Sequence, residues 1–394
     1  MDSFARKTAT GDIPYWIALG VYLFFAVLQT SFYRKYVPQG NLMNVILLLL
    51  MLLLVFREIR FGSFDSAAGL LLFSAAVFAV NALMGSTLFM AFPFFLIFCG
   101  RDVPPGKLFL FTSCCTFALL LLVCGGALSG VITNYQRIEA NRESNRAYLG
   151  FLYALYAGTL FFNGCALLLT VRGRRIRPLT LALLFAGGLW IYRETDGRFS
   201  FLMTAALIAF HVAAMLYPSV MRHAGKAFAA VIPLFPLCAV GSVVLTLRFN
   251  AAVRWMYRLD NALNHRLTYG LQSIEKFGIH LTGHPVKWIG YGLNADGYAL
   301  TGDYLYVDNM YLNFLQRFGW IAFVLAVVLV TAALIRLYRA GRNELLFIFF
   351  LITLHGLFDD LSLQLAYNTF WIAAAHALTA GGCRKEAWDY ESVC

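Results

Sequence analysis

The chain has 394 residues, of which 60% are hydrophobic and only 13% are charged, whereas a soluble domain carries about 25% charged residues. This composition excludes a set of soluble domains and indicates an all-α, polytopic integral membrane protein. The formal net charge of +11 does not indicate nucleic-acid binding. The basic residues lie between apolar segments, where the positive-inside rule accounts for most of them.

About twenty apolar residues cross the hydrocarbon core of a bilayer, and the sequence predicts about twelve such spans in one transmembrane domain, residues 1–394. Arg6 and Lys7 precede the first span without a convincing cleavage site, so we expect a retained anchor. The predicted spans are 14–33, 41–56, 66–83, 86–100, 107–130, 149–171, 178–193, 199–218, 227–247, 309–335, 343–357 and 361–380.

Lysine and arginine predict a topology in which both termini are cytoplasmic, and the Arg172–Arg177 cluster is its strongest marker. The residues placed inside are Arg6, Lys7, Arg57, Arg60, Arg101, Lys107, Arg172, Arg174, Arg175, Arg177, Arg222, Lys226, Arg336, Arg339, Arg342, Arg384 and Lys385. The residues placed outside include Arg34, Lys35, Arg137, Arg142, Arg146, Arg193 and Arg198. This many external arginines indicate either an error in the topology or an anionic ligand on the outer face.

Residues 248–308 form the only long hydrophilic interval, which we expect to be an external loop. Apolar residues recur at steps of three or four from Val253 to Phe277, which predicts an amphipathic helix. Trp255 and Tyr257 suit a helix at the membrane interface. The Gly290-Tyr-Gly292 stretch predicts a turn. Because loops on a rigid scaffold often carry function, we expect recognition or chemistry in this loop.

Three groups of polar residues near the predicted outer surface are functional candidates, and each has a structural alternative. Arg142 and Arg146 can form surface pairs with Glu139 and Glu143 at a spacing of three residues. The candidates in the short turn before the eighth span are Arg193, Asp196 and Arg198, which can instead pair within a hairpin. Ionisable groups so close to the bilayer are costly, which favours a functional role for them.

The third group lies around the last spans. Asp308 and Asn309 open an apolar helix, with Tyr311 one turn further on. Asp308 can act as a base or simply as the helix N-cap. Asp359 and Asp360 form either an acid/base or sugar-binding pair or a solvated turn.

No motif of a soluble enzyme is present, and the sequence predicts no cofactor. His280 and His284 have the spacing of two metal ligands on a helix. Gly283 lies between them and Pro285 follows, so a helical site is not expected, and we predict no metal.

Several motifs occur in a shared order between Arg142 and Phe370. They are Thr195-Asp-Gly-Arg-Phe-Ser200, Leu259–Arg266 followed by Leu271–Phe277 and Ile289-Gly-Tyr-Gly292, Val307-Asp-Asn-Met-Tyr-Leu312 with Arg317-Phe-Gly-Trp320, and Gly356–Asp360 with Tyr367-Asn368. Together they resemble the bacterial polysaccharide repeat-unit polymerases of the Wzy type, within the O-antigen polymerase and ligase-like superfamily. Two departures are Gly197, where the family has serine, and Leu149–Tyr156, which lacks the His-Pro-Asn that often follows its first residues.

The resemblance implies a GT-C-like glycosyltransferase in the bacterial cytoplasmic membrane. Its substrate would be an undecaprenyl-pyrophosphate-linked glycan, polymerised at the outer face into capsular, exo- or O-antigen polysaccharide. A flippase and a chain-length regulator are the partners that the resemblance suggests, and no metal is required.

Specific roles follow for the matching positions. Asp308 is expected to be the base, while Arg146, Arg198 and Arg266, with Arg142 in reserve, are expected to hold the pyrophosphate through their planar donor forks. The residues expected to bind sugar or orient the base are Asp196, Asn309, Tyr311 and Asp360.

Two alternatives remain open at this point. A ligase that transfers the glycan from lipid to another acceptor would share the arginines, but its family typically has a histidine where this chain has Asp308. A twelve-helix transporter would show an internal repeat and short loops, and neither is evident.

Overall fold

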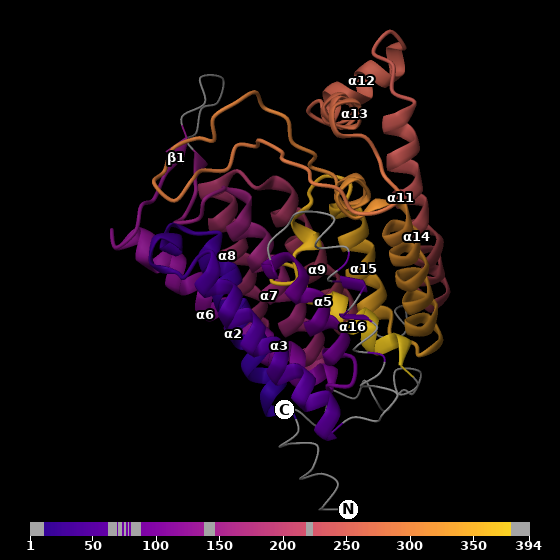
Figure 1. The fold of residues 1–394 in the computed structure, drawn as a ribbon. Helices are drawn as coiled ribbons and strands as arrows, with labels where there is room; N and C mark the ends of the chain where they lie inside the picture. The colour runs from indigo at the N-terminus through magenta and orange to yellow at the C-terminus, as the bar shows by residue number, and fades with distance from the viewer. Residues whose placement is uncertain are drawn as a thin grey trace, which may run out of the picture.

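The computed structural model describes residues 12–61, 88–137, 146–217 and 224–379, with a few isolated positions between 69 and 79. These segments form a bundle of helices with almost no sheet (Figure 1). Among the described residues, six helices are long and apolar enough to cross a membrane. The composition therefore predicted the helical membrane architecture correctly, whereas the count of twelve spans stays a prediction.

The first half of the chain contains α2 (Ile13–Gln29), α3 (Asn41–Phe61), α5 (Leu88–Gly100), α6 (Pro105–Leu128), α7 (Leu155–Arg172), α8 (Pro178–Thr195) and α9 (Arg198–Leu216). The second half contains α11 (Val231–Leu247), α12 (Arg254–Ala262), α13 (Arg266–Phe277), α14 (Met310–Arg339), α15 (Asn343–His355) and α16 (Phe370–Leu378). Short 3-10 helices are η1 (Phe32–Tyr36), η2 (Gly173–Arg175), η3 (Ala224–Ala230) and η4 (Leu361–Leu363), and the two-residue strands β1 (Gln136–Arg137) and β2 (Arg146–Ala147) pair antiparallel.

One predicted span cannot be compared with the structure, and another differs from the observed helix. The third, 66–83, falls almost entirely outside the described residues. The twelfth, 361–380, begins with η4 and a turn, and its helix starts only at Phe370. This irregular stretch is buried in protein, where its backbone finds partners: Asn368 Nδ2 and Trp371 Nε1 both donate to the Ser362 carbonyl, at 3.1 and 2.7 Å.

One end of the bundle, which we call the loop end, carries η1, the β1–β2 hairpin and the long loop. Backbone hydrogen bonds join these pieces: Phe32 N donates to Gly150 O, Leu152 N to Thr30 O and Leu293 N to Leu152 O, each at 2.9 Å. Residues 148–153 therefore connect the end of α2 to the long loop.

The opposite end holds arginines that the sequence places in the cytoplasm. Arg57 and Arg101 share Glu58 at 2.7 and 3.0 Å, and Arg336 donates to the carbonyl of Leu378 at the end of α16. Arg57, Arg101 and Arg336, which are predicted to lie inside, are thus at the opposite end of the bundle from Arg34 of η1 and Arg137 of β1, which are predicted to lie outside, while the side that faces the cytoplasm stays a prediction.

Cysteine labelling tests that orientation. Ser273 would be a natural labelling position by sequence, but its side chain is fully buried and accepts a hydrogen bond from Trp288 Nε1 at 2.8 Å. Thr301 is exposed in the same loop, which has no cysteine. We expect a membrane-impermeant maleimide to label Thr301→Cys in intact cells and Arg339→Cys only after permeabilisation; the reverse pattern would invert the topology.

The amphipathic region of the loop is two helices, so the prediction of one helix from Val253 to Phe277 is wrong. Asn264 and His265 break it, with φ of 53° and 62°. Asp260, near the end of α12, then caps α13: its Oδ1 accepts from Leu267 N at 2.9 Å and from Thr268 N at 3.1 Å. An apolar period cannot reveal such a break, because both helices keep the same spacing.

The rest of the long loop crosses the bundle from α13 toward β1 and returns to α14 (Figure 1). In the part of the loop near η1 and β1, Asp296 pairs with Lys35 Nζ at 3.2 Å, and the Arg137 guanidinium lies 4.2 Å from the centre of the Tyr291 ring. Ile289 and Leu305 exchange two backbone hydrogen bonds of 3.0 Å where its two arms meet. The loop therefore covers the loop end of the bundle as an ordered layer.

Candidate functional site

The candidate site is centred on the extended segment that leads into α14. Alternate residues of an extended chain face the same way, so Tyr304, Tyr306 and Asp308 share one side. Burial raises the pKa of Asp308 to about 6, and the negative charge of Asp360 acts in the same direction, whereas Arg266 and a hydrogen bond from Tyr304 oppose the shift. A carboxyl group with a pKa near neutrality is suited to accept a proton.

Asn309, and not Asp308, caps α14. The Asn309 Oδ1 accepts hydrogen bonds from Tyr311 N at 3.1 Å and Leu312 N at 3.0 Å. The alternative interpretation of Asp308 as the helix cap is therefore wrong, and its carboxylate is left for another role.

Arg266, the first residue of α13, joins three separate segments. Its Nε donates to the Asp308 carbonyl at 3.3 Å, its Nη1 to Leu263 O at 3.0 Å and its Nη2 to Phe358 O at 2.8 Å. A guanidinium has five N–H donors, so donors remain for a ligand. Arg266 therefore contacts the Asp308 segment through the backbone and acts on the Asp308 carboxylate through its charge.

Asp359 and Asp360 are buried, so they do not form a solvated turn. Asp360 Oδ2 accepts hydrogen bonds from Tyr306 Oη and Asn313 Nδ2, both at 2.9 Å. Burial raises the pKa of Asp360, while the charge of Arg317 lowers it. Burial and the charge of Asp360 raise the pKa of Asp359 well above its usual value. The expected acidic pair is therefore a buried continuation of the Asp308 site.

Tyr153 brings a further segment to this group. Burial raises the pKa of its phenol, Asp308 and Asp359 raise it further, and Arg146 lowers it. Arg146, in β2, donates from Nε to the Thr195 carbonyl at 3.1 Å. The structure thereby brings Arg146 and the two carboxyl groups around one tyrosine of the segment that lacks the family's His-Pro-Asn.

Arg198 and Asp196 form an exposed pair with 3.1 Å between Arg198 Nε and Asp196 Oδ1, as the structural alternative predicted. The following residue, Phe199, packs on Phe358 with 4.7 Å between ring centres. Phe358 is also the residue whose carbonyl binds Arg266. Phe358 is therefore contacted by Arg266 and by the residue that follows Arg198, whereas Arg142 lies outside the described residues.

Asn309 and Tyr311 have structural roles. The side-chain oxygen of Asn309 accepts the hydrogen bonds that cap α14. Tyr311 is 3% exposed and donates its hydroxyl to Thr353 O at 2.9 Å inside the bundle. Their polar groups are engaged within the protein, which removes the basis for expecting them to bind sugar.

Several residues of the site were not identified from the sequence. Tyr304 and Tyr306 could have been found from their alternation with Asp308, and Asn313 and Arg317 from their spacing of four on α14. Arg317 lies over the Trp288 ring at 4.8 Å, and its buried Nε has no hydrogen-bond partner among the described residues. The role of Tyr153 had no local signal.

An aromatic platform lies beside Asp308. The Tyr304 ring stacks on Tyr291 with 4.3 Å between centres and meets Tyr269 edge-on at 4.9 Å. Such rings offer apolar faces with polar edges, and ligand sites combine apolar walls with a few placed polar groups. The arrangement therefore suits a ligand with both hydroxyl groups and apolar faces, next to a base.

Gly290 is required by the close approach of Tyr306. A Cβ at Gly290 would lie 2.9 Å from Tyr306 Cδ2, whereas one at Gly292 would meet nothing nearer than Leu152 O at 4.0 Å. We expect Gly290→Ala to displace Tyr306 and its bond to Asp360, reducing activity about tenfold, as for loss of one hydrogen bond to a charged group. Gly292→Ala is the matched control. Equal activities of Gly290→Ala and Gly292→Ala, measured at equal membrane abundance, would contradict this role of Gly290.

The two histidines singled out by spacing stack on each other with 4.1 Å between ring centres. In the part of the chain that the structure describes, no group of three or more His, Cys, Asp or Glu side chains is placed to hold a metal ion.

No protein-family model matches the chain, and neither curated proteins nor solved structures give a significant match. The class that fold and site define is an α-helical membrane protein with a buried carboxylate and arginine site under a long loop.

Proposed function

We propose that this protein is a glycosyltransferase that polymerises polyprenyl-pyrophosphate-linked oligosaccharide repeat units at the outer face of a bacterial cytoplasmic membrane. The observation that carries the proposal is the Asp308 carboxyl group, with a pKa near 6, at the end of the long loop and beside Arg266 of the same loop. The order of motifs that resembles repeat-unit polymerases supports the same assignment.

The reaction joins two lipid-linked units. The acceptor sugar hydroxyl attacks the anomeric carbon of the donor unit, Asp308 takes the hydroxyl proton, and the bond between that carbon and the pyrophosphate oxygen breaks. The polyprenyl pyrophosphate departs with the bonding electrons. A positioned base and fixed positive charge at the leaving group are what this step needs.

Arginines near the site are suited to the leaving group. Arg266 keeps N–H donors after its three carbonyl contacts, and Arg198 presents a side chain that is 75% exposed. Arg146 acts on Tyr153, beside the same carboxylates. Arginine recognises phosphate through two parallel donors, so an anionic ligand accounts for the excess of arginine at this end.

Deletion of the gene tests the class of reaction. We expect the deletion strain to accumulate polyprenyl pyrophosphate carrying a single repeat unit on the outer leaflet. Polymer accumulated on the same lipid would instead indicate a ligase, and repeat units retained on the inner leaflet would indicate a transporter. Mass spectrometry of extracted lipid-linked glycans separates single units from polymer, and labelling of the glycan on intact spheroplasts before extraction separates the two leaflets. The wild-type gene supplied in trans is the control.

The pKa of Asp308 predicts the pH dependence. The base is active when deprotonated, so the polymerisation rate should rise with pH and level off above about 6. The free energy of unfolding changes with pH in the opposite direction to the rate. The folded protein binds this proton more tightly than the unfolded chain, so the stability it contributes is present below pH 3.8 and is lost as pH rises to about 6. Initial rates from pH 5 to 8 check the profile, and a flat profile would contradict it.

A further inference from the structure

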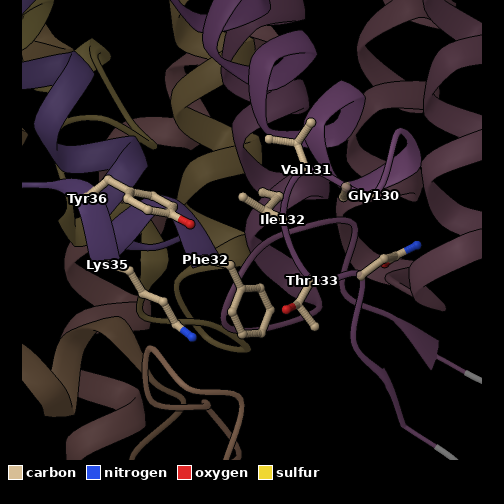
Figure 2. Close-up of a pocket in the computed structure, with 9 residues that line it drawn as sticks. Phe32, Lys35, Tyr36, Gly130, Val131, Ile132 and Thr133 are labelled. Carbon is tan, nitrogen blue, oxygen red and sulfur yellow. The ribbon is translucent and has the colours of Figure 1, made fainter.

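A polar cleft lies at the loop end of the bundle, separate from the residues of the Asp308 site. It has a volume of about 390 Å³, within the range of about 300–1,000 Å³ common for small-molecule pockets. Figure 2 shows the η1 side chains Phe32, Lys35 and Tyr36 on one side and residues 130–133, which follow α6, on the other.

The cleft combines rings with hydrogen-bonding groups. Tyr36 is 75% exposed and Phe32 is held at 2% exposure, so one ring is available and the other forms a fixed wall. Lys35 and Thr133 contribute an ammonium and a hydroxyl group (Figure 2). Asn134 is fixed in place because its Oδ1 accepts a hydrogen bond from Leu149 N at 3.1 Å. Aromatic faces beside such groups suit a sugar ring, which has apolar faces and a rim of hydroxyls.

The wall of the cleft is continuous with the candidate active site. Tyr148 N donates to Tyr135 O and Phe32 N to Gly150 O, each at 2.9 Å, and three residues after Gly150 comes Tyr153, whose phenol is within electrostatic range of Asp308 and Asp359. The long loop reaches the cleft as well, through the ion pair of Asp296 with Lys35 at 3.2 Å. A chain-like ligand that starts at Asp308 could therefore continue under the loop to this cleft.

We propose that the cleft between η1 and residues 130–134 is a distal subsite that holds a sugar of the growing glycan, several residues away from the bond being formed. This inference rests on the proposed function and adds a second place at which the protein binds the glycan. Contacts remote from the reacting bond retain a long chain between additions, so this subsite would determine product length and would contribute little to the first joining of two short units.

The experiment uses purified full-length protein and lipid-linked single repeat units extracted from the deletion strain. Thr133→Trp fills the cleft, and Tyr36→Ala removes its exposed ring. The matched control is Tyr298→Ala, which removes an exposed tyrosine of the long loop that does not line the cleft. Two quantities are measured: the initial rate at which two single units are joined, and the distribution of product lengths at equal turnover.

We expect Tyr36→Ala to shorten the products about two- to tenfold, the weakening that follows from loss of one aromatic contact. Thr133→Trp should shorten them at least as much, because its indole takes the space of the sugar, and the rate of the first joining should stay at the wild-type level in both variants. Wild-type product lengths in both variants would overturn the subsite. Equal loss of the first joining in Tyr36→Ala would also overturn it, since the cleft would then serve the reaction centre itself. Absence of any polymer from the wild-type protein would instead refute the proposed function.

Discussion

Replacing Asp308 with asparagine is expected to lower the rate of polymerisation by about 10²–10⁴-fold, the usual contribution of a general base. Asparagine keeps the shape and a polar oxygen but cannot accept the proton at neutral pH. The cap of α14 is not affected, because Asn309 provides it. The measurement is polymer length and initial rate on lipid-linked units, at matched membrane abundance of the two proteins.

Asp303→Asn is the matched control, because Asp303 is an exposed carboxylate in the same loop. It should polymerise at the wild-type rate and keep the rise in rate near pH 6. If Asp308→Asn behaves like this control, Asp308 is not the base. The assignment would then pass to Asp360, the neighbouring carboxyl group, which already accepts two hydrogen bonds.

Replacing Arg266 is expected to have the second largest effect. Its guanidinium supplies positive charge beside Asp308 and also binds the carbonyl groups of Asp308 and Phe358. Arg266→Gln removes the cation that lowers the pKa of Asp308, so the rise in rate should move to higher pH. It also removes hydrogen bonds from a charged donor, each of which contributes about 1.5–3 kcal/mol, so the maximal rate should fall more than about tenfold.

Two further variants separate these effects. Arg266→Lys keeps the charge but loses the fork that reaches Leu263, Asp308 and Phe358, so we expect a lower rate with a smaller shift of the pH profile. Arg258→Gln, at an exposed arginine of α12, is the control and should change neither the maximal rate nor the pH profile. A pH profile that stays at the wild-type position in Arg266→Gln would show that Arg266 has only a structural role.

The sequence predicts the helices well because crossing a bilayer imposes a simple rule on apolar length. Asp308 and Arg266 are conspicuous in the sequence as polar residues of one long loop in an apolar chain, and their roles stay predictions. The break at Asn264 and His265 is not predictable from the apolar period, because it depends on the side chain of Asp260 reaching α13.

The remaining parts of the site depend on contacts between distant segments. By sequence, Asp359 and Asp360 are either a functional pair or a solvated turn, and only the contacts of Asp360 with Tyr306 and Asn313 exclude the turn. Tyr153 comes within electrostatic range of Asp308 because residues 148–153 bind the long loop, through the hydrogen bond from Leu293 N to Leu152 O. No spacing rule connects such positions, so only a three-dimensional structure brings them together.

The central claim is that this protein joins lipid-linked repeat units and releases the lipid carrier. The most direct test places purified protein in liposomes with lipid-linked single repeat units and measures polyprenyl pyrophosphate released together with the glycan products. The account predicts a ladder of polymers with one polyprenyl pyrophosphate released per new glycosidic bond, and neither product with Asp308→Asn. Intact repeat units, or the same release from wild-type and Asp308→Asn proteins, would contradict it.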